Sequence, residues 1–291
     1  MKPSVLELIK RFPVGLKFLY KDVQQYYNIS AAATTHINKW AGIVPRRQAE
    51  QQRKLIRDLV KVAIPVSFAS IPVIGNSFFI LCAWRPSLFL SSHFFQTKYN
   101  RSFAQDEYKQ RFGAYKNTAE DFWHSIMRNP KDVGLKIEGK DKAGPIFNTL
   151  PLYRLFDKLN STHIPRQQMK NIAKTSGMQF PFLTIVPDAF IRFRLNSIAA
   201  DIISDDSNLL AEKHQENNCE SLTDKEVLDA CSLRGLPCDL RQSYGSMRKC
   251  LSNYLAMVGP VYTAIGKNDL LKSRDGVMFV IHLQAIRSSL T

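Results

Sequence analysis

Residues 221–257 read SLTDKEVLDACSLRGLPCDLRQSYGSMRKCLSNYLAM, and this stretch decides the fold class. Thr223 and Glu226 have the spacing of a capping box, which predicts that a helix begins here. Gly235 directly after Arg234 predicts where that helix ends, and a second amphipathic helix follows a short loop. The apolar positions are Val227, Leu228 and Cys231 in the first helix, and Met247, Cys250, Leu251, Tyr254 and Leu255 in the second. We therefore expect a tight helix pair. The residues expected to meet in its core are Leu228, Cys231, Leu251 and Leu255.

The helical pattern continues upstream, with no alternating β-branched run between hairpin turns. Pro165 opens the segment RQQMKNIAKTSG, in which Gly177 supplies a stop. Pro187 and Asp188 open a longer helix in the same way, and another helix is expected over residues 101–117. The expected core residues of the longer helix are Ile191, Leu195, Ile198 and Ile202. We therefore predict an all-α domain over residues 85–291.

A run without any charged residue or histidine precedes this domain. It covers residues 62–84, VAIPVSFASIPVIGNSFFILCAW, and its 23 residues would rise about 35 Å as a helix. That length crosses a bilayer, so we predict a single transmembrane helix, kinked at its prolines. A buried core helix is the alternative. The residues that mark the segment are Val62, Pro65, Pro72, Gly75, Asn76 and Trp84.

Residues 1–61 form a basic N-terminal segment. They contain 12 Lys or Arg and 4 Asp or Glu, while the whole chain of 291 residues carries a net charge of +15. The first 22 residues are compatible with an amphipathic helix broken at Pro13, and a polar basic helix is expected after Pro45. An excess of positive charge suits acidic partners, such as RNA, anionic lipid or an acidic protein surface.

The motifs of common enzyme classes are absent from the sequence. It contains no GxSxG, GxxxxGK[ST], GxGxxG or HExxH pattern, so we predict no enzymatic activity and no cofactor. The cysteines form no CxxC pair, which argues against a metal site and against a secreted disulfide framework. They are Cys82, Cys219, Cys231, Cys238 and Cys250.

The helix pair LTDKEVLDACSLRGL and MRKCLSNYL, preceded by FIRFRLNSIAADI and LFDKLNSTHIPRQQMKNIAK, resembles the LETM domain of the leucine zipper and EF-hand transmembrane family. The order of a basic helix, a proline-containing apolar segment and a helical domain is also similar. The likeness covers roughly residues 45–265 and is strongest for the short LETM domain-containing branch. It implies a 14-3-3-like helical fold in a single-pass mitochondrial inner-membrane protein, with the C-terminal domain in the matrix.

The resemblance also implies partners. These are mitochondrial ribosomes or matrix assembly factors, with inner-membrane lipid around the apolar segment and a homo-oligomer as a further candidate; no small-molecule substrate is identified. Through them the protein would support mitochondrial organisation and the respiratory chain. Calcium binding is not implied, because the nearest acidic cluster lacks the Gly and Glu of an EF-hand loop. That cluster is Asp201, Asp205 and Asp206.

The sequence is compatible with two functions. The first is docking of an acidic partner on a charged surface of the helical domain. The alternative is a part in mitochondrial cation/proton exchange. Exchange is disfavoured because the apolar run offers only small polar groups, such as Asn76, at mid-depth. The candidate docking residues are Arg192, Arg194, Arg234, Arg241, Arg248 and Lys249.

The charge distribution and the family resemblance predict opposite orientations in the membrane. More basic residues precede residues 62–84 than follow them, so the positive-inside rule places the N-terminus in the matrix. The resemblance places the C-terminal domain there instead. We follow the resemblance, because large domains can translocate regardless of a charge bias.

Overall fold

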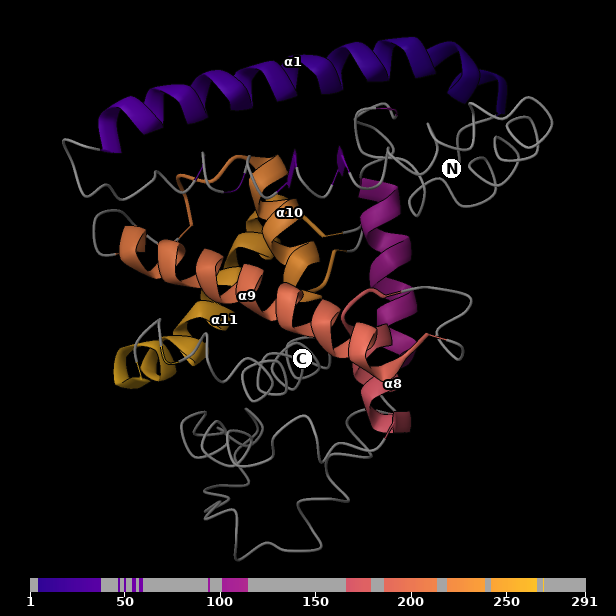
Figure 1. The fold of residues 1–291 in the computed structure, drawn as a ribbon. Coiled ribbons are helices and arrows are strands. Elements are labelled where there is room, and N and C mark those ends of the chain that lie inside the picture. Colours follow the sequence, from indigo (N-terminus) through magenta and orange to yellow (C-terminus); the bar gives the residue numbers. More distant parts are fainter. Residues whose placement is uncertain are drawn as a thin grey trace, which may run out of the picture. The chain divides into compact units, whose positions relative to one another are not determined.

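The computed structural model describes only part of the chain. Described are residues 5–37, 47, 50, 54–55, 58–59, 94, 101–114, 166–178, 186–213, 219–238, 242–265 and 269. Figure 1 shows helices and no strand in these residues, which confirms the predicted all-α class for the described part. The chain divides into two compact units, residues 1–103 and 104–291, and each is described by itself.

The longest helix described in the first unit is α1 (Val5–Ile37). The predicted break at Pro13 is wrong, since the helix runs through this residue. Proline removes one backbone donor, but here its ring lies on the exposed side while the opposite side is anchored by packing. The Phe12 and Phe94 ring centroids are 5.2 Å apart, and a Cβ at Gly15 would come within 2.5 Å of the Phe94 ring. Gly15 is therefore required for this close approach.

The second unit contains α8 (Arg166–Thr175) and α9 (Asp188–Lys213), which pack against each other. Both begin near the predicted prolines, and α8 ends, as predicted, just before Gly177, whose φ of 82° is left-handed. The backbone N–H of Met178 donates to the carbonyl of Ala173 at 2.9 Å and closes the turn. The predicted core residues of α9 are buried or packed against the core.

Helices α10 (Asp224–Arg234) and α11 (Tyr244–Ile265) form the predicted pair. The capping box is present: the backbone N–H of Thr223 donates to Glu226 Oε2 at 2.7 Å, and the Glu226 N–H donates to Thr223 Oγ1 at 3.3 Å. Gly235 ends α10 at a left-handed φ of 69°. Each predicted boundary of α10 is therefore confirmed.

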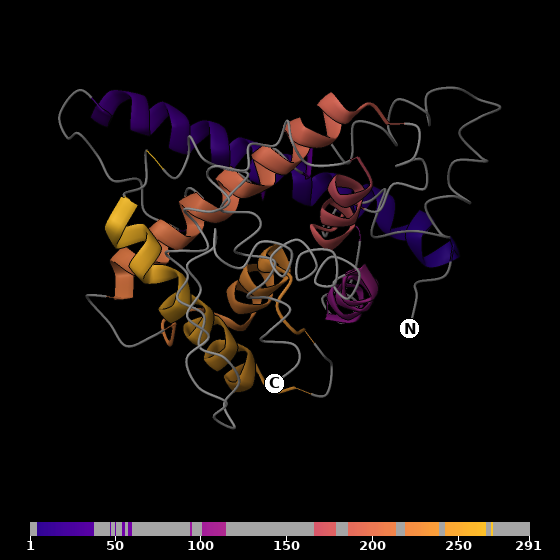
Figure 2. The same ribbon diagram turned by 90° about the horizontal axis from the view of Figure 1, so that it is seen from below.

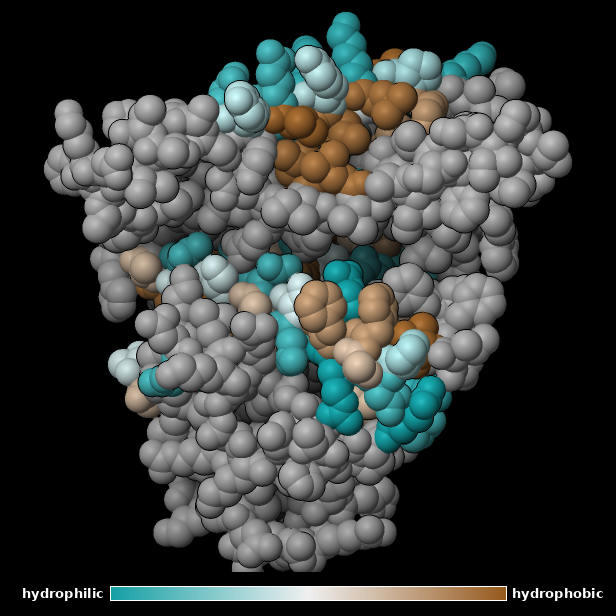
Figure 3. Space-filling view, in the orientation of Figure 1, coloured by the Kyte–Doolittle hydropathy of each residue, from teal (hydrophilic) through white to brown (hydrophobic). Residues whose placement is uncertain are grey.

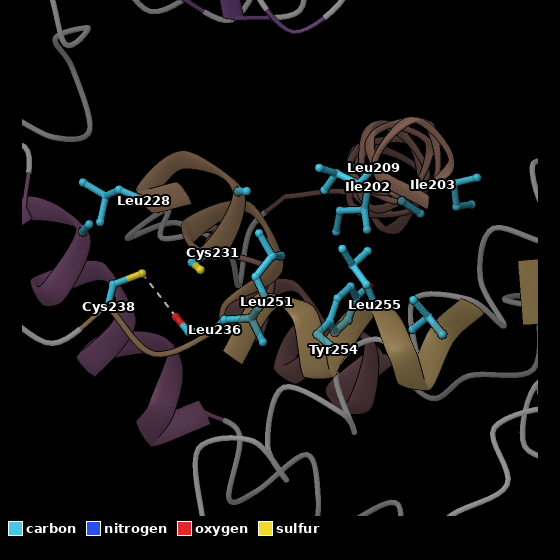
Figure 4. Close-up of a cluster of buried hydrophobic side chains, with 14 of the residues drawn as sticks. Ile202, Ile203, Leu209, Leu228, Cys231, Leu236, Cys238, Leu251, Tyr254 and Leu255 are labelled. Carbon is cyan, nitrogen blue, oxygen red and sulfur yellow. Dashed lines mark hydrogen bonds between the residues drawn. The ribbon is translucent and has the colours of Figure 1, made fainter. Parts of the chain in front are cut away.

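One hydrophobic core joins these helices. Helix α11 packs against both α10 and α9, and the views of Figures 1 and 2 agree on this arrangement. In Figure 4 the side chains of Leu251 and Leu255 on α11 point toward α10 and α9. All four residues predicted to meet belong to this core, which confirms the predicted packing; they are Leu228, Cys231, Leu251 and Leu255.

An arginine links this core to a further helix, residues 101–114. Arg111 is buried, and its Nη1 donates to the backbone carbonyl of Ser232 near the end of α10 at 2.7 Å. Its guanidinium also lies against Gly177, so that any side chain at that glycine would collide with it. The helix over residues 101–114 is thereby fixed to the ends of both α8 and α10.

The predicted membrane segment, Val62–Trp84, lies outside the described residues. Among the helices that are described, none combines the length and the apolar character needed to cross a bilayer.

Candidate functional site

Arg234, one of the six candidate docking residues, lies in the core instead of on a surface. It is 1% exposed at the end of α10. Its Nε donates to Asp206 Oδ1 at 2.8 Å, its Nη2 donates to Asp205 Oδ2 at 2.7 Å, and its Nη1 donates to the carbonyl of Ala230 at 2.9 Å. The prediction that Arg234 contributes to docking is therefore wrong, because Asp205 and Asp206 of α9 hold it inside the fold.

Asp206 is the centre of this arrangement. Its Oδ2 accepts hydrogen bonds from the hydroxyls of Tyr254 and Tyr262 on α11, each at 2.9 Å. The guanidinium of Arg234 also lies 5.6 Å from the centre of the Tyr254 ring. The network joins α9, α10 and α11, and we call it the Arg234 network. Its members are Asp205, Asp206, Arg234, Tyr254 and Tyr262.

Burial controls the protonation of these groups. It raises the pKa of Asp206 above its ordinary value, and the neighbouring Asp205 acts in the same direction against Arg234. Burial opposes the charge on Arg234, but Asp206 and Asp205 together outweigh it and hold the Arg234 pKa well above its ordinary value. Burial and then Asp206 raise the pKa values of Tyr254 and Tyr262, so both phenols stay protonated as donors. The network is an ionic link inside the fold, and of its members only Tyr262 is partly exposed.

The basic residues of α11 lie nearer the surface. Arg248 Nη2 donates to the backbone carbonyl of Leu222 at 2.9 Å and to Asp224 Oδ1 at 2.8 Å. These bonds fix Arg248 to the start of α10. Lys249 is exposed, as expected, and Arg241 lies outside the described residues.

Helix α9 carries two exposed aromatic rings beside its basic candidates. Phe190 is 45% exposed and Phe193 is 68% exposed, whereas Ile191 on the opposite side is fully buried. Arg192 and Arg194, both half-buried, stand on either side of the rings. Over the N-terminal half of α9, Figure 3 shows a tan patch bordered by teal side chains.

The sequence interpretation missed the basic residues of α8. Arg166, Lys170 and Lys174 recur at every fourth position, and the ten residues of α8 include no Asp or Glu. This spacing places them along one side of the helix, away from the buried Met169. The spacing can be recognised in the sequence, but the same ten residues also carry an apolar stripe, which predicts only packing.

An ion pair brings this row to the start of α9. Arg166 Nε lies 3.3 Å from Asp188 Oδ1, and its Nη2 donates to the carbonyl of Val186 at 3.4 Å. We call the resulting surface the α8–α9 face. It consists of Arg166, Lys170, Lys174, Phe190, Phe193 and Arg194.

Comparison with known proteins identifies the family of the chain. A family model described as LETM1-like, RBD matches residues 44–262, which is most of the sequence. The chain belongs to the LETM1-like ribosome-binding domain family. No curated protein matches the chain.

The LETM1-like match includes α8, α9, α10 and most of α11, so the Arg234 network and the α8–α9 face both lie within the family domain. In the described part of this LETM1-like domain, no group of His, Cys, Asp and Glu is arranged to hold a metal ion. Cys219, Cys231, Cys238 and Cys250 are not part of a disulfide. Burial raises the pKa of Cys231 well above its ordinary value, so this thiol is an inert part of the core.

Proposed function

We propose that this LETM1-like protein binds mitochondrial ribosomes through the α8–α9 face and has no catalytic activity. The family match supports a ribosome-related partner. The observation that carries the choice of surface is the row of three basic residues along α8, which has no acidic residue within it. A ribosome presents phosphates, and each phosphate neutralised by Lys or Arg releases a counterion on binding.

The α10–α11 pair is the less suitable surface. Its two arginines already have carboxylate partners, Arg234 in the core and Arg248 at Asp224. The exposed Lys225 shares α10 with Glu226 and Asp229, and the exposed Lys249 directly follows Arg248, which pairs with Asp224. Nearby carboxylates weaken the attraction of a surface for phosphate. We therefore assign docking to the α8–α9 face.

We further propose that residues 62–84 anchor the protein in the mitochondrial inner membrane and that the LETM1-like domain faces the matrix. The support is the uncharged run in the sequence together with the family. Protease treatment of mitoplasts tests the orientation. The matrix placement predicts that the domain is protected, and cleavage of the domain from the outer side would contradict it.

A tether of this kind would hold ribosomes or assembly factors at the membrane where respiratory-chain subunits are inserted. The alternative, a part in cation/proton exchange, depends on residues 62–84, which lie outside the described residues. The described residues supply no observation in its favour, so we propose tethering alone.

Ribosome cosedimentation at graded salt concentrations tests the proposed function. We expect the full chain to pellet with ribosomes at low salt and to dissociate as salt rises, because the contacts are with phosphates. Lys170→Glu combined with Lys174→Glu should abolish association without unfolding the domain. The matched control is Lys225→Glu with Lys249→Glu, which reverses two exposed lysines elsewhere and should retain binding.

Two outcomes would contradict the proposal. Absence of the chain from the ribosome pellet at low salt would reject ribosome binding itself. If the Lys170→Glu, Lys174→Glu variant and the Lys225→Glu, Lys249→Glu control lost ribosome association equally, net charge, and not the α8–α9 face, would determine association.

A further inference from the structure

The exposed phenylalanines of α9 are not part of the hydrophobic core that the described residues form. Phe190 and Phe193 are three residues apart and therefore point to the same side of the helix. Ile191 and Leu195, on the opposite side, already supply the buried contacts of this segment. Large apolar rings left in water are costly, so an exposed pair on a rigid helix indicates a partner.

The surroundings of the two rings are basic. Residues 166–175 and 186–200 contain five Lys or Arg and a single carboxylate, Asp188. That carboxylate forms an ion pair with Arg166 at 3.3 Å. Arg194 lies four residues after Phe190, at the spacing of neighbours on one side of a helix. The rings are thus set in a positive field.

We infer that the α8–α9 face binds unpaired RNA, with bases stacked on Phe190 and Phe193 and phosphates held by Arg194 and the basic row of α8. Aromatic rings beside cationic side chains are the combination by which proteins bind single-stranded nucleic acid. This inference rests on the proposed function and names the component of the ribosome that is recognised: single-stranded ribosomal RNA, in loops or at ends.

Chemistry favours RNA over an apolar protein surface. A protein groove or a hydrophobic helix requires a continuous apolar patch, whereas the rings here are bordered by Arg192 and Arg194 and by the small side chains of Ala189 and Ser197. Two isolated rings offer little area to such a partner. They do offer two flat surfaces to bases, and every base has a face that can stack.

The test distinguishes binding by stacking on an aromatic ring from binding by apolar surface area alone. The probe is oligouridine, which is single-stranded, and binding of the full chain in mild detergent is followed by fluorescence anisotropy. Phe190→Leu with Phe193→Leu keeps apolar side chains but removes the rings, and we expect oligouridine affinity to fall about ten-fold or more. Phe193→Trp keeps a stacking surface and should retain affinity.

The matched control is Phe112→Leu. Phe112 is 41% exposed on the helix over residues 101–114, where its ring centroid lies 6.0 Å from that of Tyr108. We expect this substitution to leave RNA affinity unchanged. Unchanged melting temperatures in all variants would show that they fold, since each altered side chain is exposed.

Duplex RNA provides a second arm of the experiment. Bases inside a duplex cannot stack on a protein side chain, so the double leucine substitution should change duplex binding by less than two-fold, an estimate that reflects phosphate contacts alone. If the double leucine substitution lowered the affinity for duplex RNA and for single-stranded RNA equally, the assignment to stacking would be overturned.

Three further results would overturn the inference without touching ribosome binding. The chain could pellet with ribosomes yet fail to bind oligouridine. The double leucine variant could bind oligouridine as the parent does. Finally, the double leucine variant could retain ribosome association while the variant Phe190→Asp with Phe193→Asp loses it. That result would indicate an apolar contact with a ribosomal protein. Absence of ribosome association at low salt would instead reject the proposed function.

Discussion

The α10–α11 pair and the α8–α9 face both carry basic side chains, but they differ in how many of these side chains are paired with carboxylates. In the pair, Arg234 is buried between Asp205 and Asp206, and Arg248 connects the start of α10 to α11. On the α8–α9 face, Arg166 pairs with Asp188, but Lys174 is exposed, Lys170 is half-buried and α8 itself contains no carboxylate.

The difference shows that the position of the nearest carboxylate decides what a basic residue does. An arginine that reaches carboxylates on a neighbouring helix becomes part of the fold, because burial strengthens the attraction and makes an unpaired charge costly. A basic residue far from any carboxylate remains available for an anionic partner. Substitutions in the pair should therefore change stability, whereas substitutions on the face should change binding.

Removing the guanidinium of Arg234 should have the largest effect on stability. Arg234→Met leaves Asp205 and Asp206 buried without their cation, and we expect the free energy of unfolding to fall by about 3–5 kcal/mol. Urea denaturation followed by circular dichroism measures this change. The control Lys249→Met, at an exposed position, should shift it by no more than about 0.5 kcal/mol. A loss below about 1 kcal/mol for Arg234→Met would show that the network contributes little.

A cavity in the core between the helices should cost somewhat less. Leu251 is fully buried where α11 meets α10, as Figure 4 shows. Leu251→Ala removes its packing and should lower the free energy of unfolding by about 3 kcal/mol. Leu59→Ala, at a residue that is 40% exposed, provides the control and should be nearly neutral. Equal destabilisation by both substitutions would contradict the packing described for the pair.

The N-cap of α10 should contribute about 1 kcal/mol. Thr223→Ala removes the hydroxyl that accepts from the Glu226 N–H, and that donor is then left to water. The melting temperature of the alanine variant should be slightly lower than that of the parent. Thr223→Ser keeps the hydroxyl and should have the melting temperature of the parent. If serine failed to restore it, the methyl group and not the cap would be responsible.

The smallest stability effect is expected at the surface of α11. Arg248→Gln with Lys249→Gln breaks the ion pair to Asp224, which is a partly exposed contact worth less than about 1 kcal/mol. Ribosome association should persist in this variant, since the α8–α9 face is intact. Loss of association in a folded protein would transfer docking to the α10–α11 pair and reverse the comparison.

Local signals in the sequence predicted the helix pair correctly. The capping box, the glycine after Arg234 and the apolar spacing of α11 each depend on residues within one or two turns, so they can be recognised without knowing the fold. The burial of Leu251 followed from the same periodicity.

Long-range pairing could not be predicted in this way. Arg234 was assigned to a surface because its partner Asp206 lies 28 residues away in the sequence, and nothing local indicated that α9 would bring two carboxylates to it. Pro13 shows the reverse error, since its local effect on a helix was outweighed by packing around Gly15 and Phe94. The basic row of α8 could have been predicted from its spacing of four residues and from the absence of Asp and Glu within residues 166–175.

The Arg234 network also restricts how this sequence can diverge. If Arg234 is replaced first, two carboxylates remain in the core without a cation. If Asp206 is replaced first, the hydroxyls of Tyr254 and Tyr262 lose their acceptor. Each single step costs much of the stability that a domain has to spare, so drift at one position is blocked until another has changed. In descendants of this chain, substitutions within the network should therefore accumulate together, while those on the α8–α9 face are restrained by the partner it binds.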